Sequence, residues 1–293
     1  MSFSQAAQTT PATPHRHAKE DLQTYYRRVR QDTEDLCRPL AIEDYCIQTE
    51  PFVSPTKWHI AHISWFFEAF VLKHFQPAYR EFNPRFDYLF NSYYVTHSQP
   101  YPRPERGLLS RPAVDEIYRY RAHVDDAMLE LIDSVDDDLW QALSDRVTLG
   151  LNHEQQHQEL MLTDIKHVFA RNPLRPAYRE NNTLADGESK PIRWIESDGG
   201  VRNVGQSSDD FCFDNETPRH RVLTGAHVLA SRLATNGEYM EFIEAGGYRE
   251  PDHWLADGWS TVRQNKWEAP SYWERQDNEW WQMTLSGMRP VRE

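Results

Sequence analysis

Two histidines four residues apart, His153 and His157, are the first feature of this sequence that could do chemistry. In a helix, this spacing places both imidazole rings on one face, close enough to share a single metal ion. A histidine pair on an apolar face can equally be a hydrogen-bonded pair in a protein core, so the spacing alone leaves both interpretations open. A third ligand from another segment would favour the metal.

The candidate third ligand lies in the segment that follows Ser54 and Pro55, where a cap residue and a proline predict the start of a helix. His62 is in register with the residues that should face the core, Trp58, Trp65 and Ala69. We therefore choose His62 over His59 as the ligand. His59 is expected to be a rim residue or a hydrogen-bond partner of a ligand.

The string His-Glu-x-x-His also matches the signature of zinc metalloproteases, in which Glu154 would act as the general base. The extended form of that signature has a glycine and a third histidine where this sequence has Leu160 and Thr163. A downstream glutamate ligand is hard to place, because the chain is predicted to be loop-like after Ala170. The three-histidine centre is the favoured interpretation.

Four helices would position these histidines, and apolar residues that recur every three or four positions predict them. They are expected over residues 20–37, 54–72, 112–134 and 146–170, the last with a short helical lead-in near Leu139. Such helices form a bundle, and bundle interiors commonly hold metal sites. Residues 76–112, rich in Pro, Tyr, Asn and Arg, are expected to be a long ordered loop over one end of the bundle.

A second domain is predicted after Pro173, where the composition changes and short strand-like runs begin. Its one clear helix is expected at 236–245, followed by tryptophans in largely irregular sequence that mostly pack this domain. The fold class is α+β. The predicted division is a disordered tail at 1–17, a helical metal-binding domain at 18–172, a linker at 173–191 and a second domain at 192–293.

Composition limits the function classes. The 32 basic and 45 acidic residues give a formal charge of −13, and no basic patch stands out, so we expect neither nucleic acid nor a membrane as partner. No apolar run is long enough to span a bilayer. The three cysteines are scattered, which favours a reducing cytoplasm.

Several longer motifs occur in order along the chain, at Ser54–Glu68, Leu89–Tyr94, Arg106–Pro112, His153–His157, Asn215–His220 and Thr235–Phe242. Together they resemble the sulfoxide synthases of ergothioneine biosynthesis, the hercynine oxygenases of the EgtB type. In that family a DinB-like four-helix domain is fused to a C-type-lectin-like domain of the formylglycine-generating-enzyme kind. The resemblance spans about residues 20 to 293.

The resemblance implies an iron(II) centre with His62, His153 and His157 as ligands. It also implies three substrates, namely hercynine, dioxygen and the thiol of cysteine or γ-glutamylcysteine, and a sulfoxide product with a new carbon–sulfur bond. The ligand set alone suits iron, copper, nickel or zinc, so the ion is named by the resemblance.

The same resemblance assigns further site residues. Gln156 matches a glutamine that hydrogen-bonds the substrate imidazole, although a surface glutamine fits the pattern equally. Tyr93 and Tyr94 match a tyrosine pair placed near the iron as proton donor and oxygen-facing partner; the alternative is a pair of core aromatics under a loop. We favour function for Tyr94.

Three arginines of the loop, Arg85, Arg103 and Arg106, could each pair with the carboxylate of the thiol substrate, because a guanidinium binds a carboxylate through two hydrogen bonds. For any one of them, a solvated surface arginine is the alternative.

Members of that family continue past the point that corresponds to Glu293, so we expect a chain truncated at its C-terminus, with an incomplete second domain and a completing polypeptide as a partner. Three alternatives stay open. They are a DinB-like metal-dependent thiol transferase using zinc or nickel, a related selenium-inserting synthase, and an inactive truncated remnant.

Overall fold

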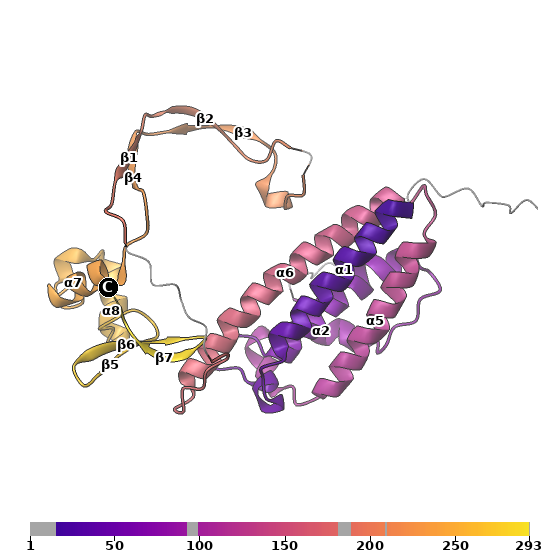
Figure 1. Ribbon diagram of the computed structural model, residues 1–293, viewed down its shortest axis with the longest axis horizontal. Coiled ribbons are helices and arrows are strands. Elements are labelled where there is room, and N and C mark those ends of the chain that lie inside the picture. Colours follow the sequence, from indigo (N-terminus) through magenta and orange to yellow (C-terminus); the bar gives the residue numbers. More distant parts are fainter. Residues whose placement is uncertain (1–15, 93–98, 181–188, 209, 293) are drawn as a thin grey trace, which may run out of the picture. The chain divides into compact units, whose positions relative to one another are not determined.

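The computed structural model describes residues 16–92, 99–180, 189–208 and 210–292, and its contacts divide the chain into two units after Val168. The first unit is helical and the second contains small antiparallel sheets (Figure 1). The predicted α+β class is confirmed. Among the described residues, no helix is both long and apolar enough to cross a membrane.

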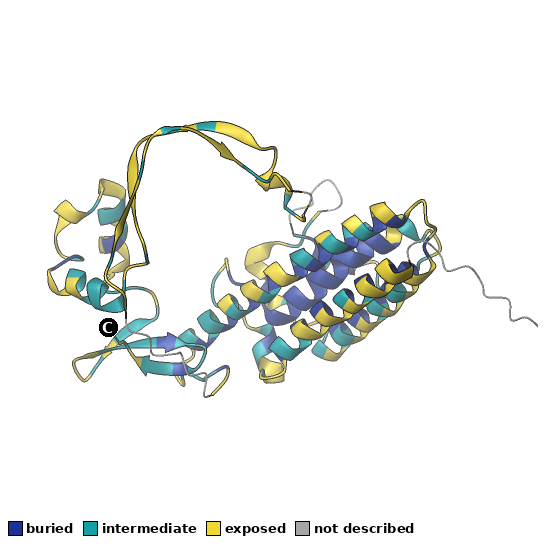
Figure 2. Ribbon diagram, turned by 45° about the horizontal axis from the view of Figure 1, so that its top comes forward, coloured by how far each residue is buried: buried dark blue, intermediate teal, exposed yellow. Residues whose placement is uncertain are grey.

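Four long helices form the first unit: α1 (Arg16–Cys37), α2 (Thr56–Phe67), α5 (Val114–Ser134) and α6 (Trp140–Arg171). They lie side by side as a bundle (Figure 1), with their buried faces turned inward (Figure 2). Leu22, Tyr26, Val29 and Thr33 show why α1 forms, since their spacing places them on one buried stripe.

Two predicted boundaries differ from the structure. Arg16 and His17, assigned to the tail, are the first residues of α1. The lead-in near Leu139 is not a separate piece, because α6 runs without a break from Trp140 to Arg171. The missing break has a simple cause, since residues 140–171 include neither proline nor any other helix-stopping signal besides Gly150.

Helix α2 is buried along its whole length, all twelve of its residues included. Its C-terminus continues through a π-helical turn at Glu68–Leu72 and a last helical turn, α3 (Lys73–Phe75). The predicted loop covers part of α2 and contains the short helix α4 (Phe86–Phe90) and a 3-10 turn at Arg103–Leu108. This loop supplies backbone carbonyls to α2, for example from Leu89 to the indole of Trp58.

The second unit contains two two-stranded antiparallel ribbons, β1–β4 (Trp194–Ser197 with His227–Ala230) and β2–β3 (Gly200–Val204 with His220–Thr224). Helices α7 (Asn236–Glu244) and α8 (Ala256–Asn265) follow. The last element is a three-stranded sheet of β5 (Trp273–Gln276), β6 (Glu279–Thr284) and β7 (Gly287–Pro290).

The tryptophan-rich segment was expected to be irregular, and this expectation was wrong. It forms α8 and the β5–β6–β7 sheet. Its tryptophans at 254, 259, 273, 280 and 281 are half-buried, and three of them contact other aromatic rings, whereas Trp267 is exposed. Three of them, Trp267, Trp273 and Trp280, line a cavity of about 1090 Å³ within this unit.

Candidate metal centre

Three histidines from two helices meet inside the bundle. His62 comes from α2, and His153 and His157 come from α6. One ring nitrogen of each lies within 4.8 Å of those of the other two, a separation that a single metal ion can bridge. His62 and His157 are buried and His153 is half-buried. The structure therefore brings together the three residues that the sequence singled out.

Aromatic packing fixes the ring of His62. The indole of Trp58 stacks on it with ring centroids 4.6 Å apart and an interplanar angle of 11°, and that of Trp65 lies at 5.4 Å and 21°. Trp58 and Trp65 lie on the same face of α2 as His62. This face therefore packs into the core and also orients the imidazole ring. A ring held by packing binds an ion with less loss of side-chain freedom.

A hydrogen bond fixes which nitrogen of His62 carries a proton. Its Nδ1 lies 2.5 Å from the carbonyl oxygen of Phe90, in the loop that covers α2. A carbonyl can only accept, so Nδ1 donates, and Nε2 of the neutral ring keeps a lone pair for a ligand bond.

The site keeps its imidazoles neutral, which is the form that binds metals. Burial lowers the pKa of His153 to about 4. Burial likewise holds the pKa values of His62 and His157 well below their usual range, and the neighbouring histidines lower them further. In addition, Nδ1 of His153 is buried without a hydrogen-bond partner among the described residues. A donor set of neutral imidazoles with one unsatisfied buried nitrogen fits a bound cation.

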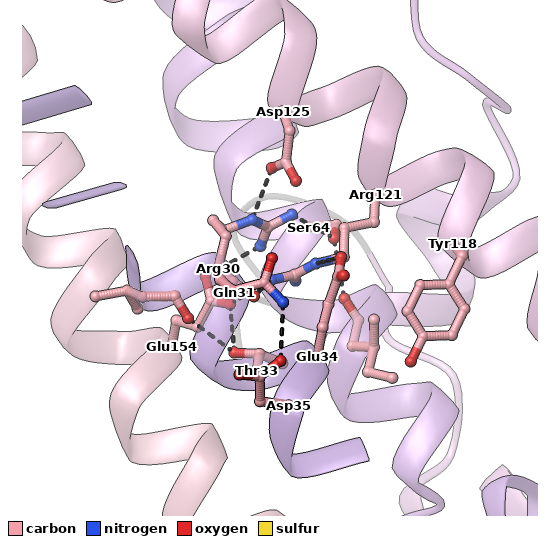
Figure 3. A network of polar contacts seen from close by, with 12 residues as sticks. Arg30, Gln31, Thr33, Glu34, Asp35, Ser64, Tyr118, Arg121, Asp125 and Glu154 are labelled. Carbon is pink, nitrogen blue, oxygen red and sulfur yellow. Dashed lines mark hydrogen bonds and ion pairs between the residues drawn. The ribbon is translucent and has the colours of Figure 1, made fainter. Parts of the chain in front are cut away.

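The glutamate of the His-Glu-x-x-His string, Glu154, points toward Arg30 and Thr33 (Figure 3). Its carboxylate is fully buried and pairs with Arg30 at 3.0 Å and with Arg121 at 2.9 Å, and it also accepts a hydrogen bond from Thr33 at 2.6 Å. Burial alone would raise its pKa, but the two guanidiniums hold the pKa of Glu154 below its usual range. A carboxylate so occupied is no general base, so this geometry argues against the metalloprotease interpretation.

Apart from Arg106, the other predicted site residues are exposed or lie outside the described part of the chain. Gln156 is exposed on α6, and Arg85 and Arg103 are exposed in the loop, where Arg103 donates to the carbonyl oxygen of Phe52. Tyr93 and Tyr94 lie outside the described residues. Gln156, Arg85 and Arg103 are thus exposed, whereas two of the three histidines are buried.

Arg106 differs from the other two arginines because it is buried. Its guanidinium donates to the hydroxyls of Ser54 and Ser92 and lies 3.3 Å from the ring centroid of Trp58. Trp58 in turn stacks on His62. Arg106 thus supports the indole that holds a candidate ligand, a contact across 48 positions of sequence that helical periodicity could not reveal.

The sequence of the four-helix unit was compared with known protein families. Residues 25–161 match the DinB superfamily, so the four-helix unit with its histidine cluster is similar to DinB domains.

Comparison with individual curated proteins finds relatives that share sequence with most of this chain. A hercynine oxygenase of Mycobacterium tuberculosis is 30% identical over 231 residues, which are 78% of this chain and 52% of the relative. The hercynine oxygenases of Mycolicibacterium thermoresistibile and Mycolicibacterium smegmatis are each 27% identical over 77% of this chain, and the matches cover 49% and 51% of those proteins. The resemblance to hercynine oxygenases is confirmed, and the chain spans about half the length of the curated relatives it matches.

Proposed function

We propose that this chain binds one iron(II) ion through His62, His153 and His157 and uses dioxygen to join the sulfur of cysteine or γ-glutamylcysteine to the imidazole ring of hercynine. The observation that carries the proposal is the convergence of three buried or half-buried, neutral imidazoles in a DinB-like bundle. The reaction class is supported by relatives that are named hercynine oxygenases.

The choice of iron rests on chemistry and on this similarity together. Three neutral imidazoles leave several coordination positions open, and they suit iron, copper, nickel and zinc alike. When bound, iron(II) would supply open positions and the one-electron chemistry that dioxygen requires. Holding both organic substrates beside dioxygen would remove most of the entropic barrier to a three-component reaction.

The proposed reaction balances without another oxidant. Joining a C–H carbon of the imidazole to the thiol sulfur removes two electrons and two protons, and oxidation of that sulfur to a sulfoxide removes two more electrons. Dioxygen accepts all four electrons, because one oxygen atom enters the sulfoxide and the other leaves as water.

Roles for the surrounding residues are part of the proposal. Gln156 would hydrogen-bond the imidazole of hercynine, and Tyr94 would donate a proton during turnover, with Tyr93 beside it. Since the guanidinium of Arg106 already contacts two hydroxyls and an indole, we propose the exposed Arg85 and Arg103 for the substrate carboxylate.

Anaerobic reconstitution tests the proposal. The full chain is loaded with iron(II), given hercynine and either cysteine or γ-glutamylcysteine, exposed to oxygen, and its products are identified by mass spectrometry. The expected product is the sulfoxide, formed with only one of the thiols at a high rate and lost in His153→Ala. His74→Ala, a change at an exposed histidine, should leave the yield unchanged.

Other outcomes of the same assay would favour one of the alternative functions. A thiol adduct formed without oxygen by the zinc-loaded protein would favour a thiol transferase. Turnover of a selenium donor in preference to both thiols would favour a selenium-inserting synthase. Absence of every product from an iron-loaded protein would contradict the proposed activity for this chain on its own.

A further inference from the structure

A chain of hydrogen bonds leads away from His157 to a carboxylate. Nδ1 of His59 lies 2.8 Å from Nδ1 of His157, and Nε2 of His59 lies 3.0 Å from Oδ2 of Asp164. His59 is 3% exposed and the side chain of Asp164 is 14% exposed, so water competes little for these bonds. Since His59 belongs to α2 and the other two residues to α6, the chain also joins these helices.

The carboxylate sets the direction of both bonds. Oδ2 of Asp164 also accepts the backbone N–H of Ser54 at 2.9 Å, and an ionised carboxylate can only accept. Nε2 of His59 must then donate. A neutral imidazole carries a single proton, so when Nε2 of His59 donates to Asp164, its Nδ1 accepts from the ring nitrogen that faces it. It follows that Nδ1 of His157 donates and that Nε2 of His157 keeps its lone pair.

We propose that His59 and Asp164 are positioning residues that hold His157 in its Nδ1–H tautomer, so that Nε2 serves as the ligand atom. This inference rests on the proposed metal centre. His62 has the equivalent arrangement through the carbonyl of Phe90. The bundle therefore fixes the tautomers of two ligands, one from each helix, before any ion binds.

The first test needs no metal and no activity. The full-length, metal-free protein is labelled with ¹⁵N-histidine, and long-range ¹H–¹⁵N correlations show which ring nitrogen of each histidine is protonated. His157→Gln assigns the signal. The proposal expects His157 as the Nδ1–H form, and an Nε2–H form or a rapidly exchanging mixture in the unmodified protein would overturn it.

The second test measures binding of cobalt(II) alone, followed anaerobically by visible absorption. His59→Phe keeps a ring but removes both nitrogens, so we expect the His157 signal to become a mixture and the affinity to fall about 10- to 100-fold. His59→Gln retains an acceptor for His157 and should recover most of the affinity. His74→Phe, on the exposed α3, is the matched control and should behave as wild type.

The outcomes distinguish the positioning role of His59 from the proposed metal centre itself. A folded His59→Phe protein with unchanged cobalt affinity would overturn the positioning role while leaving the metal centre intact. If the unmodified protein binds no cobalt or iron, the metal centre fails and the positioning role fails with it. The tautomer measurement then shows whether the hydrogen-bond chain itself exists.

Discussion

Neighbouring residues of one helix can serve unrelated tasks, and His153 and Glu154 are such a pair. His153 faces the other two histidines, whereas Glu154 lies one position on and neutralises two buried arginines. The literal motif could not separate these roles, because Arg30 and Arg121 come from helices far away in the sequence. The register of His62 with Trp58 and Trp65, by contrast, was visible in the sequence and selected it correctly as the member of the cluster.

Replacing Glu154 tests its structural role. Glu154→Gln leaves two buried guanidiniums without their common counter-ion, which should lower the free energy of unfolding by about 3–5 kcal/mol. Urea denaturation followed by circular dichroism measures this. Glu159→Gln, an exposed change on the same helix, should shift the stability by less than about 0.5 kcal/mol. Equal stability of the two variants would contradict the network in Figure 3.

The thiol of Cys37 should be inert in the folded protein. Burial raises its pKa to about 12, so near pH 8 almost no thiolate is present to react. Alkylation with iodoacetamide, followed by peptide mass spectrometry, should label the half-buried Cys46 and Cys212 first and Cys37 only on unfolding. Labelling of all three cysteines at one rate would show that this part of α1 is open.

At the scale of elements, helical periodicity predicted the four bundle helices well, since three of them have one clear apolar stripe. It could not show that α2 is buried on every side, because the covering loop lies 20 to 50 residues further along the chain. The β5–β6 hairpin was missed for another reason. Asp277 and Asn278 both adopt positive φ between two strands, a known two-residue hairpin signal, but the surrounding tryptophans obscured the alternation.

The close approach of α6 to α2 depends on Gly150, one turn before His153. A Cβ at this position would lie 2.5 Å from Cε1 of Phe67 and 3.0 Å from Cε1 of Phe66, both buried. We expect Gly150→Ala to cost about 1–3 kcal/mol by overpacking, which outweighs the helix propensity of alanine, and to weaken metal binding as the helices separate.

Urea denaturation and a cobalt titration of Gly150→Ala check this prediction. Leu149→Ala, a change at the exposed neighbouring position, is the control and should leave metal affinity unaltered. A Gly150→Ala protein more stable than wild type would mean that the two helices are not in contact at this point.

At the scale of the whole molecule, the two units differ in how they are stabilised. Among the described residues, nearly all buried hydrophobic side chains belong to the bundle, whereas the second unit contributes few, among them Val262 and Met283. Its exposed apolar residues, such as Trp194 and Leu223, leave apolar surface open to solvent. The sequence could not predict this imbalance, since both parts contain abundant apolar residues.

The proposed ion should stabilise one unit only. Calorimetry of the full chain should resolve two transitions, and a metal at about 100 times its dissociation constant should stabilise the bundle by about 2.7 kcal/mol without moving the other transition. A shift confined to the second unit, or none at all, would place the ion elsewhere or exclude it.

We propose that His62, His153 and His157, from two helices, hold one iron(II) ion. An anaerobic titration with iron(II), followed by desalting and metal analysis, tests it most directly in the wild type, in His62→Ala and in the control His74→Ala. We predict one iron per chain in the wild type and the control, and almost none in His62→Ala. Retention of a full equivalent of iron by folded His62→Ala would show that the ion is bound without this histidine.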